Sequence, residues 1–119
     1  MKQILIVDDS ISLAHALAAC LVGGYEVAVS HGGAEALARA ETLPGCDLLV
    51  TDYQMPDMNG AELAVRFRQR YPEAKVLLLT GFGEELDLSA SPAGPVDSRL
   101  DKPFGPTELR EAVRALIGT

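Results

Sequence analysis

The sequence contains little cysteine. Only two cysteines, Cys20 and Cys46, occur among its 119 residues, which is too few for a disulfide framework. Cys20 lies within a helical pattern, and Cys46 precedes an apolar run typical of a strand. We therefore expect two reduced, partly buried thiols that behave as small apolar residues.

Basic residues and long apolar runs are also scarce. Ten Lys and Arg residues stand against 17 Asp and Glu residues, which gives a formal net charge of −7. Because nucleic-acid-binding domains carry basic faces, we expect no direct contact with nucleic acid. The apolar runs are shorter than the ~20 residues needed to cross a bilayer. Met1 and Lys2 lead straight into an apolar run, so we expect no signal peptide, no membrane contact and a cytoplasmic location.

Strand-like apolar runs alternate with helical spacing along the chain. The patterns predict strands at 3–7, 25–29, 47–52, 75–80 and 96–101, and helices at 11–22, 33–41, 61–70 and 106–117. In the segment 81–95, Pro92, Gly94 and Pro95 favour a short or irregular fourth helix. The alternation indicates an α/β fold, in which right-handed crossovers place helices on both faces of a parallel sheet. The length predicts a single domain, 1–119.

Two helical faces can be assigned from spacing alone. In the first helix, Ile11, Ala14, Ala18 and Leu21 are spaced along one face, which is typical of an amphipathic helix. In the third helix, Arg66, Arg68 and Arg70 are expected to form a solvated face.

Polar residues lie at the ends of four predicted strands. They are Asp8 and Asp9, Asp52, Thr80 and Lys102. Parallel strands bring their carboxyl ends to one edge of a sheet, where open α/β sheets bind ligands. Three carboxylates gathered there repel one another unless a cation lies among them. With only oxygen ligands and no His or thiolate nearby, Mg²⁺ is the expected cation, and Mn²⁺ is a possible substitute.

A magnesium site of this kind binds phosphate oxygens. Lys102 and the hydroxyl of Thr80 are suited to hold them, and Asp52 is then a candidate nucleophile toward phosphorus. A structural alternative for Asp8 and Asp9 is that they cap the first helix, although one Asp would be enough for that. His15 and His31 are expected on the surface or on a helix face, and no catalytic role is expected, since no nucleophile is paired with them in the sequence.

Four stretches together resemble a known family. They are Ile-Leu-Ile-Val-Asp8-Asp9-Ser, Asp47-Leu-Leu-Val-Thr-Asp52-Tyr-Gln-Met-Pro56-Asp-Met-Asn-Gly60, Val-Leu-Leu-Leu-Thr80-Gly and Asp-Lys102-Pro103-Phe104. The sequence resembles a response-regulator receiver domain of two-component signalling along its whole length. The Thr-Gly-Phe-Gly run that begins at Thr80 is similar to receivers attached to hybrid sensor kinases.

The resemblance implies a flavodoxin-like, doubly wound, five-stranded sheet in the order 2-1-3-4-5. It also implies that Asp52 is the phosphoacceptor, supplied by a phosphohistidine of a sensor histidine kinase or a histidine phosphotransfer protein. Thr80 would turn toward the arriving phosphoryl group and Lys102 would pair with it.

The resemblance further implies a set of metal ligands. Asp9 would bind Mg²⁺ directly and Asp8 largely through water. Asp52 and the backbone carbonyl of Gln54 would complete the protein ligands. The Lys102–Pro103 peptide bond is expected to be cis.

One residue departs from the family pattern. Arg99 stands three residues before the lysine, where receivers usually carry Tyr or Phe, and a guanidinium does not replace a buried ring cheaply. Together with the irregular 81–95 segment, this predicts retained phosphoryl chemistry with an altered output surface, or a role as a phosphate shuttle or sink.

Three other functions remain open from the residues. A small phosphohydrolase could use Asp52 as its nucleophile. Such enzymes tend to carry a second acid two residues after the nucleophile, to protonate the leaving group, and Gln54 at that position cannot do so. A flavodoxin-like FMN carrier would have Asp8 and Asp9 repelling the phosphate. A degenerate receiver could act as a constitutive interaction module. The intact set of strand-end residues argues against this alternative.

Overall fold

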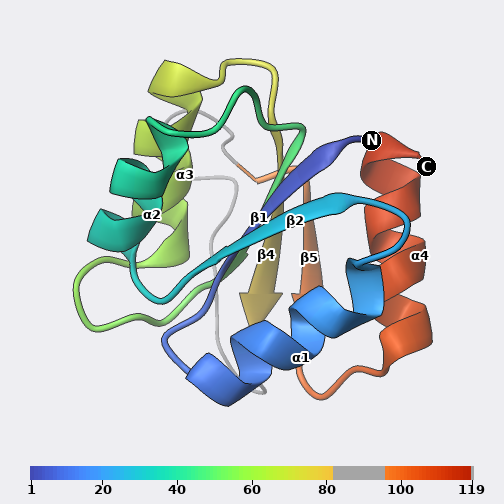
Figure 1. The fold of residues 1–119 in the computed structure, drawn as a ribbon. Helices are drawn as coiled ribbons and strands as arrows, with labels where there is room; N and C mark the ends of the chain where they lie inside the picture. The colour runs from blue at the N-terminus through green and yellow to red at the C-terminus, as the bar shows by residue number, and fades with distance from the viewer. Residues whose placement is uncertain (82–95, 119) are drawn as a thin grey trace.

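The computed structural model describes residues 1–81 and 96–118, shown in Figure 1. The strands are β1 (Gln3–Val7), β2 (Glu26–Ser30), β3 (Leu48–Asp52), β4 (Lys75–Thr80) and β5 (Ser98–Asp101). The helices are α1 (Ile11–Leu21), α2 (Gly33–Ala40), α3 (Gly60–Arg70) and α4 (Pro106–Ile117). Each predicted strand and helix outside 82–95 is present within one or two residues of its expected bounds. The expected irregular helix, with Pro92, Gly94 and Pro95, lies outside the described residues, as do the Phe and second Gly of the Thr-Gly-Phe-Gly run.

The five strands form one parallel sheet in the order β2-β1-β3-β4-β5. Val7 pairs with Thr51, Thr51 pairs with Leu78, and Thr80 pairs with Asp101. This register confirms the predicted topology and brings the carboxyl ends of the strands to one edge. The order of the strands reverses beside β1, which is where open α/β sheets bind ligands.

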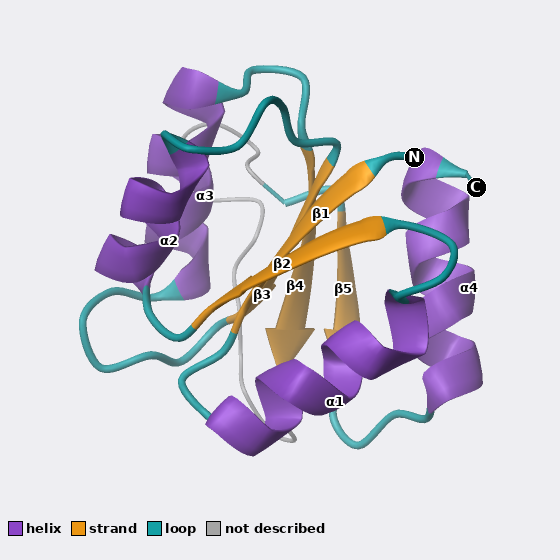
Figure 2. Ribbon diagram, viewed as in Figure 1, coloured by secondary structure: helices purple, strands orange, loops and turns teal. Residues whose placement is uncertain are grey.

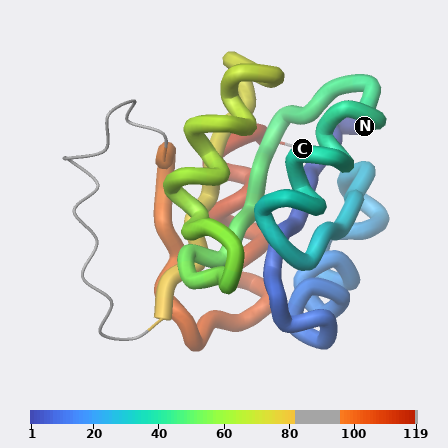
Figure 3. The backbone as a smooth tube through the Cα atoms, turned by 90° about the vertical axis from the view of Figure 1, so that its left-hand side faces the viewer, coloured from blue at the N-terminus to red at the C-terminus, as the bar shows by residue number. Residues whose placement is uncertain are grey.

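Helices cover both faces of the sheet (Figure 2). α1 and α4 pack on one face, where the core contains Ile4, Ile6, Leu17 and Leu109. α2 and α3 lie on the other face, which is turned toward the viewer in Figure 3. That core includes Leu5 and other apolar residues of β1, β3 and α3. Successive strand residues therefore enter opposite cores, which explains the uninterrupted apolar runs.

The first helix begins with a side-chain cap. The Ser10 hydroxyl accepts a hydrogen bond from the Leu13 backbone N–H at 3.3 Å, and α1 starts at the next residue. Ala14, Leu17 and Leu21 are buried as a helical stripe, whereas Ile11 is 62% exposed. Ile11 shares the helical spacing of Ala14 and Leu21 but not their burial.

The expected solvated arginine face of α3 holds only in part. Arg66 and Arg70 are exposed. Arg68 instead pairs with the Asp97 carboxylate, and its Nε donates to the Ala74 carbonyl at 3.1 Å. Asp97 also accepts from the Val76 backbone N–H at 2.7 Å. Arg68 thus ties α3 to the start of β4 and to the segment before β5.

The end of α4 is anchored to the beginning of the chain, and Figure 1 shows the two termini side by side. The Lys2 ammonium donates to the Ile117 carbonyl. The Tyr25 hydroxyl donates to the Gly118 carbonyl at 2.6 Å. These contacts lie at the amino edge of the sheet, opposite the strand ends that carry the carboxylates. Within 1–81 and 96–118, no helix is long and apolar enough to cross a membrane.

Candidate functional site

Three carboxylates meet at the carboxyl edge of the sheet. Asp8 and Asp9 follow β1, Asp52 ends β3, and one oxygen of each lies within 4.8 Å of the others. Asp8 is 1% exposed and Asp52 is 8% exposed, whereas Asp9 is open to solvent. The cluster is therefore buried at its base and open on one side, as a small-ion site requires.

Asp8 is held by the turn that leads into α1. Its Oδ1 accepts a hydrogen bond from the Ser10 backbone N–H at 2.9 Å. Its Oδ2 is buried, has no hydrogen-bond partner among the described residues, and lies 3.8 Å from the Lys102 ammonium. Because Ser10 supplies the helix cap, the capping alternative for Asp8 and Asp9 is wrong.

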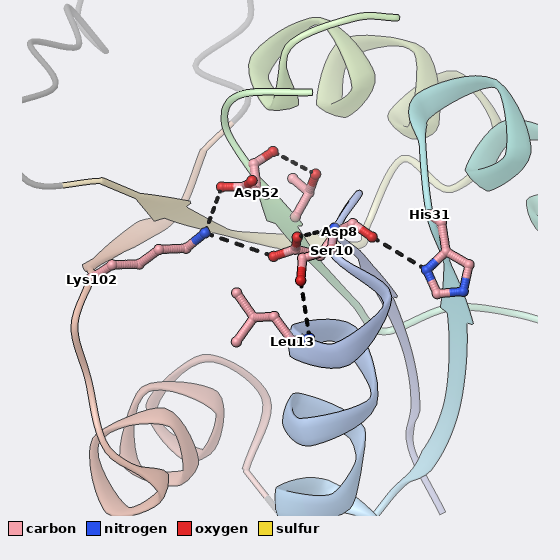
Figure 4. Close-up of polar contacts among 7 residues, drawn as sticks. Asp8, Ser10, Leu13, His31, Asp52 and Lys102 are labelled. Carbon is pink, nitrogen blue, oxygen red and sulfur yellow. Dashed lines mark hydrogen bonds and ion pairs between the residues drawn. The ribbon is translucent and has the colours of Figure 1, made fainter. Parts of the chain in front are cut away.

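Lys102 extends its ammonium to Asp52 and Asp8 (Figure 4). Its ammonium donates to Oδ1 of Asp52 at 3.1 Å, and its backbone N–H donates to the Thr80 carbonyl at 2.7 Å. Burial raises the pKa of Asp52 above its ordinary value, Lys102 opposes that rise, and the charges of Asp8 and Asp9 add to it. The Lys102–Pro103 bond is cis, as expected.

The residues present fit a divalent cation. In the part of the chain that the structure describes, three carboxylates against one ammonium leave the cluster net negative, and the buried Oδ2 of Asp8 accepts no hydrogen bond. An oxygen-only donor set suits Mg²⁺ or Mn²⁺ rather than a metal that prefers nitrogen or sulfur. Gln54, whose backbone carbonyl is the expected fourth ligand, lies in the loop two residues beyond Asp52.

That loop is fixed on both sides of Gln54. The Tyr53 N–H donates to the Leu79 carbonyl at 2.9 Å, and the Gly60 N–H donates to the Tyr53 carbonyl at 2.8 Å. A Cβ on Gly60 would lie 2.6 Å from the Asp52 carbonyl oxygen, so this close approach requires glycine.

The same loop also holds α2. The Asp57 carboxylate accepts from the first backbone N–H groups of α2, on Gly33 at 3.1 Å and on Ala34 at 2.8 Å. These bonds lower the pKa of Asp57, and a negative charge there is favourable toward the helix dipole.

Thr80 and Arg99 meet at a residue that the sequence did not single out. The buried Thr80 hydroxyl donates to Oδ1 of Asp101 at 2.5 Å. Exposed Arg99 donates to the same oxygen from Nε at 3.1 Å and from Nη2 at 2.8 Å. The sequence could have indicated this contact, because Asp101 lies beside Thr80 if the two predicted strands end at the same level, as they do.

The histidines have a contact that spacing could not reveal. His31 Nδ1 lies 3.3 Å from the Asp8 backbone carbonyl, which it contacts as a donor, and its ring stacks on that of His15 at 5.9 Å between centroids. His31 thus supports the backbone at Asp8, and the exposure expected of His15 is confirmed.

The fold and the site define a class: a flavodoxin-like α/β domain with an acidic cluster, a lysine and a strand-end hydroxyl at its switch point. Residues 4–114 match the response regulator receiver domain family, and the chain belongs to that family. Receivers of this family are signalling modules of two-component systems, whose general role is phosphorylation-dependent signalling and which bind Mg²⁺ at an acidic pocket.

Named relatives agree with this assignment. The chain is 36% identical to the alkaline phosphatase synthesis transcriptional regulatory protein PhoP of Bacillus subtilis, over 98% of this chain and 48% of PhoP. It is 29% identical to the chemotaxis protein CheY1 of Helicobacter pylori, over 98% of both chains. The chain spans about half the length of PhoP and of the similar CpxR of Klebsiella pneumoniae.

Solved structures agree as well. The chemotaxis protein CheY4 of Vibrio cholerae superposes with a TM-score of 0.86 at 30% identity, over 98% of each chain. A CheY-like receiver domain protein from Methanospirillum hungatei gives a TM-score of 0.86 at 32% identity, over 97% of this chain and 92% of that one.

Proposed function

We propose that Asp52 accepts a phosphoryl group from a phosphohistidine and that this acceptance changes a partner-binding surface. The observation that carries the proposal is the environment of Asp52. Its carboxylate shares a pocket with Asp8 and Asp9 and touches the Lys102 ammonium. A structural carboxylate needs only a partner, whereas Asp52 also lies beside two other carboxylates, and its burial, together with their charges, raises its pKa.

The transfer would make one bond and break one. A carboxylate oxygen of Asp52 attacks phosphorus, and the bond between phosphorus and the histidine nitrogen of the donor breaks. The nitrogen keeps the bonding electron pair, and Asp52 becomes an acyl phosphate. Water later attacks the phosphorus, which releases phosphate and restores the carboxylate.

Each neighbour of Asp52 would have a distinct part. Lys102 would exchange its bond to the carboxylate for one to a phosphoryl oxygen, and Thr80 would donate to another. Asp8, Asp9, Asp52 and the Gln54 carbonyl would hold Mg²⁺, which when bound neutralises charge that builds up on the phosphoryl oxygens. The added group carries roughly 1.5 to 2 negative charges, so it favours the arrangement in which both donors face it.

The partners follow from this chemistry. The donor is a sensor histidine kinase or a histidine phosphotransfer protein, and the readout is a protein that recognises the altered surface. We place all of 1–119 in one receiver domain that acts as a switch and not as an enzyme, apart from promoting its own phosphorylation and dephosphorylation.

Incubation with acetyl phosphate and Mg²⁺, followed by intact mass, tests the proposal. The mass of the wild type should rise by one phosphoryl group. No such rise should occur in Asp52→Asn, or in the wild type when a chelator removes the metal. Asp57→Asn is the matched control, because it changes an exposed carboxylate of the same loop that should stay unmodified. A gain that persists in Asp52→Asn, or none from any phosphodonor, would contradict the assignment, and sustained turnover of a phosphomonoester would replace it with a phosphohydrolase.

A further inference from the structure

We propose that Asp101 is a positioning residue that competes with a phosphoryl group on Asp52 for the hydroxyl of Thr80. This inference rests on the proposed function and adds a regulatory element to the same site. Asp101 would oppose the phosphorylated arrangement, and its removal would favour that arrangement.

The competition arises because Thr80 has one hydrogen to give. A threonine hydroxyl has a single O–H donor, and here it donates to Oδ1 of Asp101 at 2.5 Å. Thr80 is fully buried. A phosphoryl oxygen can receive that hydrogen only after the bond to Asp101 is broken.

Arg99 holds Asp101 in the position that makes this bond. Two guanidinium nitrogens of Arg99 donate to the same carboxylate oxygen that accepts from Thr80. The Thr80 hydroxyl, followed by Arg99, keeps the pKa of Asp101 below its ordinary value. The carboxylate is therefore ionised, and charged acceptors form the stronger hydrogen bonds.

The exposure of Asp101 makes the bond reversible. Its side chain is 64% exposed and that of Arg99 is 37% exposed, so water and Arg99 can satisfy the carboxylate once Thr80 leaves. Arg99 stands where receivers usually carry an aromatic residue. The pair Arg99–Asp101 consequently links the Thr80 hydroxyl to the outer edge of β5 by polar contacts.

The test measures binding of beryllofluoride, a phosphoryl analogue, by calorimetry with Mg²⁺ present. Asp101→Ala should bind it about fivefold more tightly than the wild type, which equals ~1 kcal/mol. Asp101→Asn, which keeps a weaker neutral acceptor, should lie between the two. Both variants change an exposed side chain, so the fold should be retained.

Removing the negative charge of Asp101 would also favour binding of any anion nearby. Two further variants separate this general charge effect from the competition for the Thr80 hydroxyl. In the Thr80→Val background, which has no hydroxyl at position 80, Asp101→Ala should raise the affinity for beryllofluoride only a little. In Thr80→Ser, which keeps the hydroxyl, the gain should return. The difference between the two backgrounds is the coupling of Thr80 to Asp101.

The outcomes distinguish the two proposals. Wild-type protein that binds no beryllofluoride would contradict the proposed function and this inference together. Wild-type binding without a gain in Asp101→Ala, or an equal gain in the Thr80→Val background, would overturn the role of Asp101 alone. A gain that requires the hydroxyl at position 80 is the result expected.

Discussion

The ammonium of Lys102 lies 3.1 Å from Oδ1 of Asp52, although the two residues are 50 positions apart in the sequence. Lys102 also lies 3.8 Å from Oδ2 of Asp8, which has no hydrogen-bond partner within residues 1–81 and 96–118. A single side chain from the loop after β5 therefore neutralises part of a pocket built by β1 and β3.

Lys102 and a divalent cation compete for the same carboxylates. Lys102→Ala should therefore tighten Mg²⁺ binding by on the order of tenfold, or ~1.4 kcal/mol. This is less than the ~4 kcal/mol for unit charges 4 Å apart near a surface, because Lys102 is partly exposed. Calorimetric titration with Mg²⁺ measures the change. Lys75→Ala, which removes an exposed cation at the opposite end of β4, should leave the affinity unaltered.

The raised pKa of Asp52 gives a stability prediction with a defined sign. Above the ordinary value of 3.8 the unfolded chain releases this proton more readily than the native protein does, so stability falls as the pH rises. Asp52→Asn should therefore be more resistant to urea than the wild type near neutral pH in the presence of a chelator. Below 3.8 the difference should vanish. A variant that is less stable near neutrality would contradict this.

The close approach of Gly60 to Asp52 predicts a costly substitution. In Gly60→Ala the new methyl group would meet the Asp52 carbonyl oxygen at 2.6 Å and Leu78 Cδ1 at 2.7 Å. The overpacking should lower the free energy of unfolding by about 1–3 kcal/mol. Gly45→Ala is the control, since a Cβ there has no heavy atom within 4 Å. Equal urea midpoints for the two variants would show that the loop relaxes freely.

The contacts of Arg68 predict unequal effects for two arginines on one helix. Arg68→Ala removes the pairing with Asp97 and the bond to the Ala74 carbonyl, so it should cost about 1–2 kcal/mol of stability. Arg66→Ala, at an exposed position of α3, should stay within about 0.5 kcal/mol of the wild type. Thermal melts of both variants, matched in charge, test this difference.

The backbone rules were sufficient to predict how the sheet gathers its carboxylates. Asp8, Asp9, Asp52 and Lys102 converge because parallel strands end together, and this follows from alternating patterns alone. The strand order came from the resemblance to receivers, and the structure has the same order.

Contacts between side chains of different elements could not be predicted in this way. The bond from Thr80 to Asp101 depends on the register of β4 and β5, and the pairing of Arg68 with Asp97 depends on how α3 crosses the sheet. The contact of His31 with the Asp8 carbonyl depends on where β2 ends beside β1. Helical spacing put Ile11 on one face with Ala14 and Leu21, but spacing alone does not show how much of each residue on a face is covered.

The anchoring of α4 by Lys2 and Tyr25 has a practical consequence for protein engineering. Both ends of the described chain lie side by side at the amino edge of the sheet, opposite the edge that carries the aspartates. A fluorescent reporter, an affinity tag or an effector module fused at either end would leave the mouth of the acidic pocket unobstructed. A short linker between the two ends would also allow new termini to be opened elsewhere in the chain.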